Sequence, residues 1–142
     1  MSHIDRNFTK ITRCGSQYRT EALSPMGLKA CHASYISVIC RHPGISQDQL
    51  AQKLCINKSN VARQASILEE GGFITRAPSF EDKRVLKLYP TEKTLGLLTR
   101  ILEIQDSWED WLTGDLSEEE KQTLESILSR IKEKAVRWTE VL

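Results

Sequence analysis

Five side chains between residues 58 and 64 can form hydrogen bonds, and a second polar cluster follows at residues 82–84. Lysine and arginine donate, whereas serine, asparagine and glutamine both donate and accept, so the first cluster can recognise base edges and phosphates. The second cluster places an aspartate beside two basic side chains. These residue types predict a surface for a nucleic acid. The clusters comprise Lys58, Ser59, Asn60, Arg63 and Gln64, and Asp82, Lys83 and Arg84.

Two short helices joined by a turn are predicted to position the first cluster. Ser46 and Gln49 match a capping box, which predicts a helix that ends near Leu54. Asn57 can cap a second helix that runs to about Glu70. This order is typical of a helix-turn-helix, in which the second helix is pushed outward. The residues expected inside it are Leu50, Ala51, Leu54, Ile56, Val61, Ala65 and Leu68.

A β-hairpin is predicted next. Gly71-Gly72 can end the second helix in a left-handed turn, and strand-like runs 73–77 and 85–89 flank a polar loop. An ordinary helical hairpin with a solvated face is the alternative to a helix-turn-helix, and a basic hairpin beside it favours the helix-turn-helix. The basic residues are Lys83 and Arg84 at the tip and Arg76 and Lys87 on the strands.

Long helices are predicted on both sides of this region. Ile4–Leu23 and Leu28–Arg41 precede it, separated by Ser24-Pro25-Met26-Gly27. After Pro90-Thr91 a long helix runs to a break at residues 113–115, and a capping box at Ser117-x-x-Glu120 begins the last helix. Both helices carry apolar seams that need a mate. The seams are Leu97, Ile101, Ile104, Trp108 and Trp111, then Leu124, Leu128, Ile131, Ala135 and Trp138.

Length and charge limit the class of protein. The 142 residues suit one domain with one core. Residues 1–100 hold 15 Lys/Arg and 8 Asp/Glu, whereas residues 101–142 hold 5 and 11, so only the first part suits a polyanionic partner. No apolar run approaches the ~20 residues of a membrane span, and no apolar signal core begins the chain. We therefore expect a cytoplasmic protein without membrane contact.

Three segments resemble the multiple antibiotic resistance regulator (MarR) family of winged-helix repressors. Leu68-Glu69-Glu70-Gly71-Gly72-Phe73-Ile74-Thr75-Arg76 is similar to the family's helix end and first wing strand, and Asp82-Lys83-Arg84 to its Asp-x-Arg wing motif. Leu88–Lys93 resembles the exit into its dimer helix, with the usual glycine displaced to Gly96. The resemblance covers nearly the whole chain. It implies a mainly α fold with a small β-hairpin wing, a winged helix-turn-helix with long N- and C-terminal dimerisation helices.

The resemblance also implies roles for the two polar clusters. Ser59, Asn60 and Arg63 would lie in the major groove of double-stranded DNA. Arg84 would enter the flanking minor groove, where negative potential is concentrated, with Asp82 holding its guanidinium. Cys55 departs from the pattern, because helix-turn-helix proteins often have glycine at this turn position.

A two-fold homodimer on a near-palindromic operator is a further implication. The chain would form one domain, with residues 28–90 as the DNA-binding lobe and residues 1–23 and 91–142 as the dimerisation lobe. Family effectors are often small aromatic acids. The residues expected at the dimer interface are Trp108, Trp111, Leu128, Ile131 and Trp138, and those expected in an effector pocket are Tyr18, His32 and Tyr35.

Several residues keep two interpretations. His32 either lines that pocket or is a packed core histidine, and Cys14 is either an oxidant sensor, as in some relatives, or incidental. Cys31 and Cys40 are nine residues apart, so one helix would point them to opposite sides, and we expect no metal and no cofactor. Without an export signal, the four cysteines are expected to be free thiols.

The sequence contains none of the motifs that would indicate an enzyme. It has no phosphate-cradling glycine loop, nucleophile elbow or H-E-x-x-H motif, and its paired acids fall at helix ends. The leading hypothesis is a sequence-specific DNA-binding regulator, a repressor that responds to a ligand or to oxidation. The alternatives are a winged-helix module that binds a protein, and a redox or metal sensor on the same frame.

Overall fold

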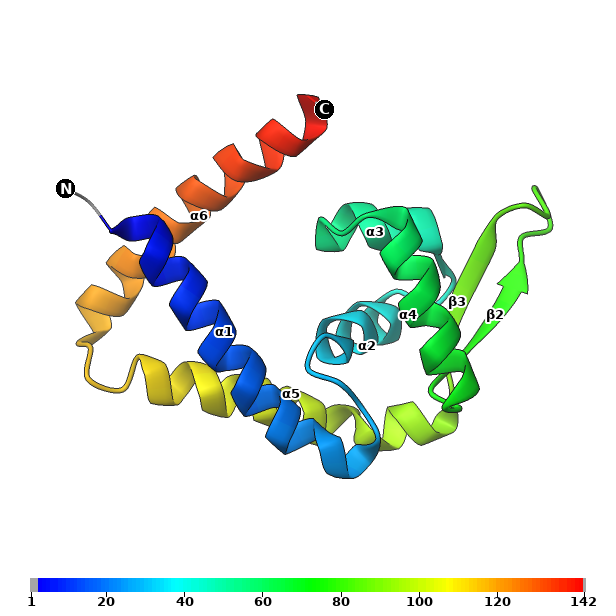
Figure 1. Cartoon of the computed structure of the whole chain (residues 1–142), viewed down its shortest axis with the longest axis horizontal. Helices are drawn as coiled ribbons and strands as arrows, with labels where there is room; N and C mark the ends of the chain where they lie inside the picture. Colours follow the sequence, from blue (N-terminus) through cyan, green and yellow to red (C-terminus); the bar gives the residue numbers. More distant parts are fainter. Residues whose placement is uncertain (1–2, 142) are drawn as a thin grey trace. The chain divides into compact units, whose positions relative to one another are not determined.

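The computed structural model describes residues 3–141, which form six α-helices, one 3₁₀ turn and three short strands (Figure 1). Contacts divide the chain after Trp108 into two compact units. The first holds all elements up to α5 and most of α5, and the second holds the end of α5 and α6. The elements are α1 (Ile4–Leu23), η1 (Ser24–Met26), α2 (His32–Arg41), β1 (Ile45–Ser46), α3 (Gln47–Leu54), α4 (Lys58–Glu70), β2 (Ile74–Pro78), β3 (Leu86–Pro90), α5 (Glu92–Leu112) and α6 (Glu118–Val141).

Side-chain caps begin three of the helices, as the sequence predicted. The Ser46 hydroxyl accepts the Gln49 N–H at 3.0 Å, and the Gln49 side chain accepts the Ser46 N–H at 3.0 Å, so the capping box of α3 is complete. Asn57 caps α4 by accepting the Asn60 N–H at 2.8 Å. The same reciprocal pattern joins Ser117 and Glu120 at the start of α6.

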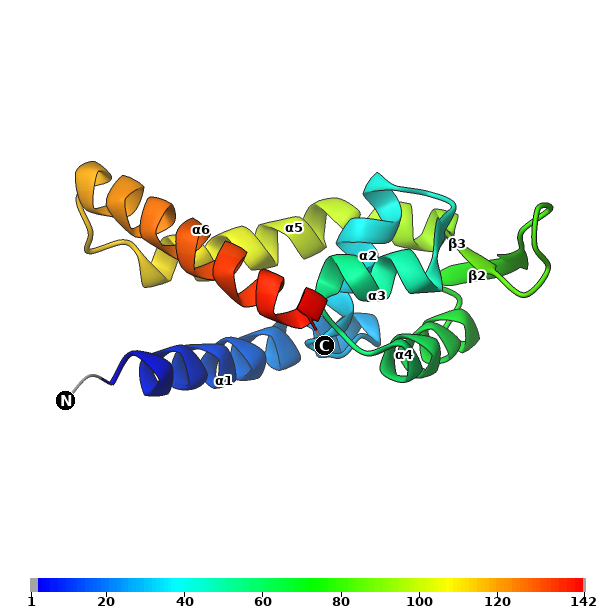
Figure 2. The same cartoon turned by 90° about the horizontal axis from the view of Figure 1, so that it is seen from above.

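The three strands form one antiparallel sheet in the order β1-β3-β2. β2 and β3 are the predicted hairpin, each shifted by one residue, and Arg76 pairs with Leu88. Figures 1 and 2 show this hairpin, the wing, projecting beyond the helices of the first unit. The two-residue β1 pairs Ile45 with Leu88 and was not predicted, because two residues are too few to show an alternating pattern.

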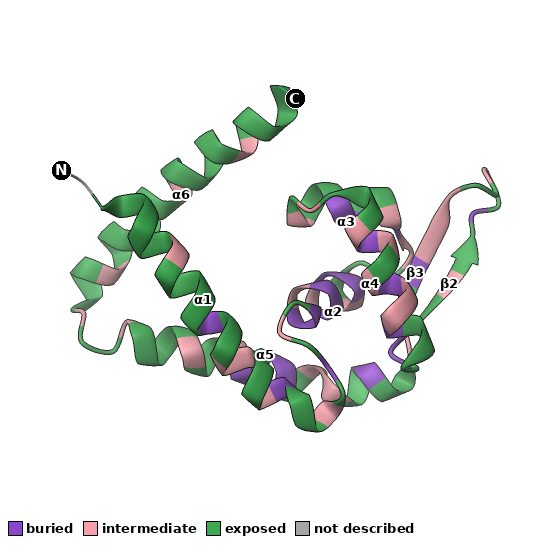
Figure 3. Cartoon of the chain, viewed as in Figure 1, coloured by how far each residue is buried: buried purple, intermediate pink, exposed green. Residues whose placement is uncertain are grey.

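The core of the first unit lies between α2, the inner sides of α3 and α4, β3 and the middle of α5 (Figure 3). The buried side chains of α4 pack on this core, so the helix is held from its inner side and its opposite side is exposed. The largest fully buried members are Leu23, Tyr35, Ile36, Ile39, Leu50, Val61, Leu68, Ile74, Leu88, Ile101 and Ile104. None of the helices within residues 3–141 has the length and apolar character of a membrane span.

The predicted start of the second helix was wrong. α2 begins at His32, not at Leu28, because Gly27 has a φ of +78° and the Leu28 N–H donates to Leu23 O, which closes the end of the preceding helix. Leu28 is buried but lies outside α2. At the end of α4 the predicted left-handed turn is made by Gly72 alone, at a φ of +77°, while Gly71 stays in the right-handed region.

Several hydrogen bonds attach the start of α5 to the end of α4. Lys93 Nζ donates to the Gly71 carbonyl at 2.8 Å and lies 4.1 Å from the centre of the Phe73 ring. The buried Thr94 hydroxyl donates to Phe73 O at 2.6 Å, and the Thr91 hydroxyl donates to Gly72 O at 2.7 Å. The start of α5 is therefore held against the residues that directly follow α4.

Candidate nucleic-acid interface

The outer face of α4 carries the first polar cluster. Val61, Ala65 and Leu68 are buried, so the helix presents its opposite side to solvent. Arg63 lies about 200° around the helix from Val61, at ~100° per residue, and it is exposed. Lys58 and Ser59 are also exposed, whereas Asn60 and Gln64 are half-buried on the flank.

Two of these side chains already have partners in the protein. The Ser59 hydroxyl donates to Asn57 Oδ1 at 2.9 Å, which leaves its oxygen lone pairs as acceptors. Lys58 Nζ lies 3.4 Å from Asp48 Oδ2 in an exposed ion pair. Such a pair is worth little in water, so Lys58 is available to a phosphate.

The turn between α3 and α4 is made by Cys55. Its backbone is left-handed, with φ +55° and ψ +43°, and within residues 3–141 it is the only residue other than glycine with a positive φ. The Ile56 N–H donates to Ala51 O at 3.0 Å, which closes the end of α3. Cys55 therefore forms the same turn that glycine often makes in helix-turn-helix proteins. Its left-handed backbone costs free energy, because the residue has a side chain.

The wing tip holds Arg84 as predicted. Asp82 Oδ1 accepts hydrogen bonds from the Arg84 backbone N–H at 3.0 Å and from Nε at 3.1 Å, and Oδ2 accepts from Nη2 at 3.1 Å. These bonds from the side chain and backbone of Arg84 lower the pKa of Asp82. The Arg84 side chain is 91% exposed, so the carboxylate orients a guanidinium that remains open to solvent. Lys83 is exposed beside it.

Sequence reasoning missed one feature of this loop, the full exposure of Phe80. Ser79 beside it is buried, its N–H donates to Val85 O at 2.8 Å, and its hydroxyl accepts the Glu81 N–H at 3.3 Å. The loop is therefore held by its own backbone, and the aromatic ring points outward. An aromatic residue within a polar, turn-rich loop was the available signal.

Arg76, counted among the basic residues of the wing, is a structural residue instead. Its guanidinium donates to Glu69 Oε1 at 3.1 Å, to Gln47 Oε1 at 3.1 Å and to the Ser66 hydroxyl at 3.2 Å. Its side chain is only 19% exposed. It ties α3, α4 and β2 together. The sequence could not show this, because Gln47 lies 29 positions away.

His32 is a packed, hydrogen-bonded histidine. It is 1% exposed, its Nδ1 accepts the Lys29 N–H at 3.0 Å, and its Nε2 lies 2.8 Å from Gln64 Oε1. Burial lowers the pKa of its imidazole, and the charge of Lys29 adds to this, while the hydrogen bond to Gln64 acts in the opposite direction. Gln64, predicted to face DNA, thus also holds the flank of α4 against α2.

This arrangement of two helices and a wing can be compared with known proteins. The MarR family model matches residues 32–86. An uncharacterised HTH-type transcriptional regulator of Bacillus subtilis strain 168, YybA, is 32% identical over 140 residues, which cover 96% of this chain and 91% of the relative. This chain belongs to the MarR family. The predicted fold class, a mainly α-helical winged helix-turn-helix, is thereby confirmed.

Solved structures of the same family match over almost the full length. A MarR crystal structure is 29% identical with a TM-score of 0.88, and covers 100% of this chain and 99% of that chain. A putative MarR family regulator from Listeria monocytogenes, solved with a 26mer DNA, is 25% identical with a TM-score of 0.90 over 96% of this chain and 91% of that one.

The MarR effector residues expected here are only partly brought together. His32 and Tyr35 lie edge to face, with ring centres 6.4 Å apart. Tyr35 is buried, burial raises its pKa, and its hydroxyl has no hydrogen-bond partner among the described residues. Tyr18 instead stacks on Trp108, with ring centres 5.0 Å apart. The assignment of an effector pocket to these three residues remains a prediction.

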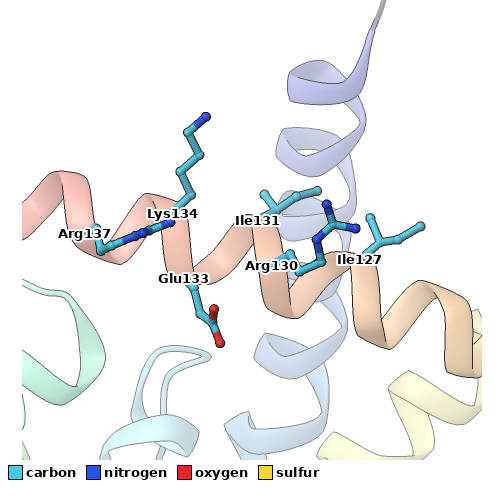
Figure 4. Close-up of a pocket in the computed structure, with 6 residues that line it drawn as sticks. All are labelled: Ile127, Arg130, Ile131, Glu133, Lys134 and Arg137. Carbon is cyan, nitrogen blue, oxygen red and sulfur yellow. The ribbon is translucent and has the colours of Figure 1, made fainter.

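The apolar side chains expected at a MarR dimer interface are exposed in the second unit. Trp111 is 75% exposed, Trp138 66%, Ile131 42% and Leu128 38%. Trp108, in the first unit, is half-buried against Tyr18. A hollow of about 550 Å³ beside Ile131 is lined by side chains of α6 alone, which Figure 4 shows projecting along that helix.

The cysteines of this MarR protein are free thiols, and Cys14 is exposed. Burial raises the pKa of Cys31 and of Cys40, which favours their protonated forms. Within the described part of the chain, no group of three His, Cys, Asp or Glu residues could hold a metal ion.

Proposed function

We propose that this MarR family protein is a homodimeric regulator that binds double-stranded DNA in a sequence-specific manner, as a repressor on a near-palindromic operator. α4 would enter the major groove, and the wing the flanking minor groove. The observation that carries the proposal is the Asp82–Arg84 contact. It fixes a guanidinium that is 91% exposed at the tip of a hairpin whose own backbone bonds hold the loop.

The proposed division of labour follows the chain. Residues 28–90 would form the DNA-binding lobe, and residues 1–23 and 91–142 the dimerisation lobe. The bonds from Lys93 and Thr94 to the end of α4 would then carry a change in dimer spacing to the DNA-reading helix. A small aromatic effector near His32 and Tyr35, or oxidation of Cys14, would change that spacing by favouring one of two conformers.

Binding to duplex DNA as a function of salt tests the proposal. Fluorescence anisotropy with the protein's own upstream region should show log affinity falling linearly with log salt, by a slope of about −0.9 for each phosphate neutralised. Arg84→Ala should weaken binding chiefly at A·T-rich flanks. Arg100→Ala removes the same charge from an exposed position on α5 and is the matched control.

The same DNA-binding titrations distinguish a base contact of Arg63 from a phosphate contact, and a DNA-binding protein from a protein-binding module. Arg63→Ala should cost about 1–3 kcal/mol and relax base preference at one position if Arg63 reads a base edge. A uniform loss across sequences would assign Arg63 to a phosphate. If the wild-type protein ignored duplex DNA even at low salt, the proposal would fail, and a winged-helix module for a protein partner would take its place.

A further inference from the structure

The proton of the buried His32 imidazole can be placed from its partners. A backbone N–H only donates, so His32 Nδ1, which receives the Lys29 N–H at 3.0 Å, must offer a lone pair. The single proton of the neutral ring is therefore on Nε2. It is donated over 2.8 Å to Gln64, so the amide oxygen of Gln64 is the atom that faces the ring.

This assignment fixes the orientation of the Gln64 amide. Its oxygen is directed at an imidazole that is 1% exposed, so its NH₂ group points away from that contact. Within residues 3–141 no group accepts a hydrogen bond from this NH₂. Gln64 is half-buried on the flank of α4, and its NH₂ is the edge of the amide that the buried ring does not hold.

We propose that His32, without touching DNA, makes Gln64 a donor-only reader of base edges. The inference rests on the proposed function, because it requires α4 in the major groove. A free glutamine recognises adenine through both amide atoms, accepting from N6 and donating to N7. Here His32 Nε2–H takes one of the two lone pairs of that oxygen, and a base amino group that used the second would have to approach beside the buried imidazole. In the proposed arrangement this approach is closed, so that Gln64 serves acceptors only.

The chemistry of the bases then defines what Gln64 selects. Adenine N7, guanine N7 and O6, and thymine O4 are acceptors in the major groove, whereas cytosine offers a donor there. Gln64 should exclude cytosine at one position of each half-site and should not choose adenine over guanine. His32 is thus a positioning residue that broadens specificity, and its removal should restore the adenine preference of a free glutamine.

In vitro selection from a randomised duplex library tests this, with wild type, His32→Phe, Gln64→Met and the double variant compared. In wild type one position should disfavour cytosine with adenine and guanine about equal. In His32→Phe the adenine-to-guanine ratio at that position should rise about 5-fold or more. In Gln64→Met the discrimination should vanish, and adding His32→Phe should change nothing further, because His32 acts through Gln64.

Three outcomes would overturn the inference. The first is an unchanged base preference in a folded His32→Phe variant, and the second is a preference for adenine in wild type. The third is a uniform loss of affinity in Gln64→Met without a change of base preference. Gln64→Glu covers the case in which His32→Phe does not fold. It offers acceptors only, so it should select cytosine, and retention of the wild-type preference would refute the donor role. Absence of any selected sequence for wild type would instead refute the proposed function.

Discussion

At the scale of single residues, His32 shows how a buried polar group is stabilised without charge. Both ring nitrogens have partners, one a backbone donor and the other an amide oxygen. A second proton would have to go on Nδ1, against the Lys29 N–H. The neutral ring is therefore the form that the folded state accommodates, which agrees with the lowering of its pKa by burial.

We predict that this histidine destabilises the protein in acid. Because the pKa of His32 is lower in the folded than in the unfolded chain, both states are neutral at pH 7.5. As the pH falls below the unfolded value of about 6.5, the unfolded chain takes up a proton that the folded chain does not, until the folded pKa is reached. The free energy of unfolding should decrease through this window.

Urea denaturation at pH 7.5 and 5.5 measures this effect. The loss of unfolding free energy between the two values should be smaller in His32→Phe than in wild type, by roughly 1.4 kcal/mol for each pH unit by which the two pKa values differ, within this window. His42→Asn, which removes an exposed imidazole, should keep the wild-type loss. Equal losses in wild type and His32→Phe would show that the pKa of His32 is the same in the folded and unfolded states.

Cys55 leads to a second prediction at this scale. Its left-handed backbone costs an L-residue about 1–2 kcal/mol, whereas glycine adopts it freely at some cost in chain entropy. Cys55→Gly should therefore raise the free energy of unfolding by about 0.5–1 kcal/mol in urea titrations. Cys55→Ala keeps the Cβ and should show no such gain. A glycine variant less stable than the alanine variant would mean that the Cys55 side chain contributes to packing.

At the scale of elements, the predictable features were local and the missed ones were not. Ser46, Asn57 and Ser117 cap helices through residues three positions away, so the sequence alone located those helix starts. The Asp82–Arg84 contact spans two positions and was implied by the resemblance to the MarR family's wing motif. Arg76 on Gln47 and His32 on Gln64 join residues 29 and 32 positions apart, and only the tertiary packing of the helices and the sheet brings them together.

Gly15 belongs to the missed features, because from the sequence a glycine inside a helix is expected only to weaken it. It is buried, and a Cβ there would lie 3.0 Å from Trp108 Nε1 and 3.1 Å from Arg19 Nη2. The Arg19 end can move, but Trp108 is stacked on Tyr18. The glycine allows the indole to approach α1 closely.

We predict opposite outcomes for two glycine-to-alanine changes. Gly96→Ala on α5 meets nothing within 4 Å and should raise the free energy of unfolding by up to about 1 kcal/mol, the difference in helix propensity. In Gly15→Ala the gain in helix propensity should be offset by the cost of displacing Trp108. Gly15→Val should lower the free energy of unfolding by roughly 1–3 kcal/mol. Thermal and urea unfolding measure both. An equal gain at the two positions would show that Trp108 moves without cost.

At the scale of the whole molecule, charge and apolar exposure are distributed along the chain to suit two tasks. The excess of basic residues lies within residues 1–100, which include the wing and α4, while residues 101–142 are acidic. In the second unit α6 has no buried residue, although Leu124, Leu128, Ile131 and Trp138 repeat along it at helical spacing. A helix with an exposed apolar seam gains stability by burying that seam, at about 25 cal/mol per Å². The proposed homodimer supplies the partner.

A charge placed in this seam should therefore separate the protomers and weaken DNA binding together. Ile131→Glu would bury a carboxylate in an apolar contact, so light scattering at micromolar concentration should report a monomer where wild type is a dimer. Ser126→Glu adds the same charge to an exposed position about 140° around α6 from Ile131 and should remain a dimer. The monomer keeps one α4 and one wing, so the slope of log affinity against log salt should fall to about half. A dimeric Ile131→Glu variant would exclude this seam from the interface, and a monomeric variant with the full salt slope would mean that one protomer makes all the phosphate contacts.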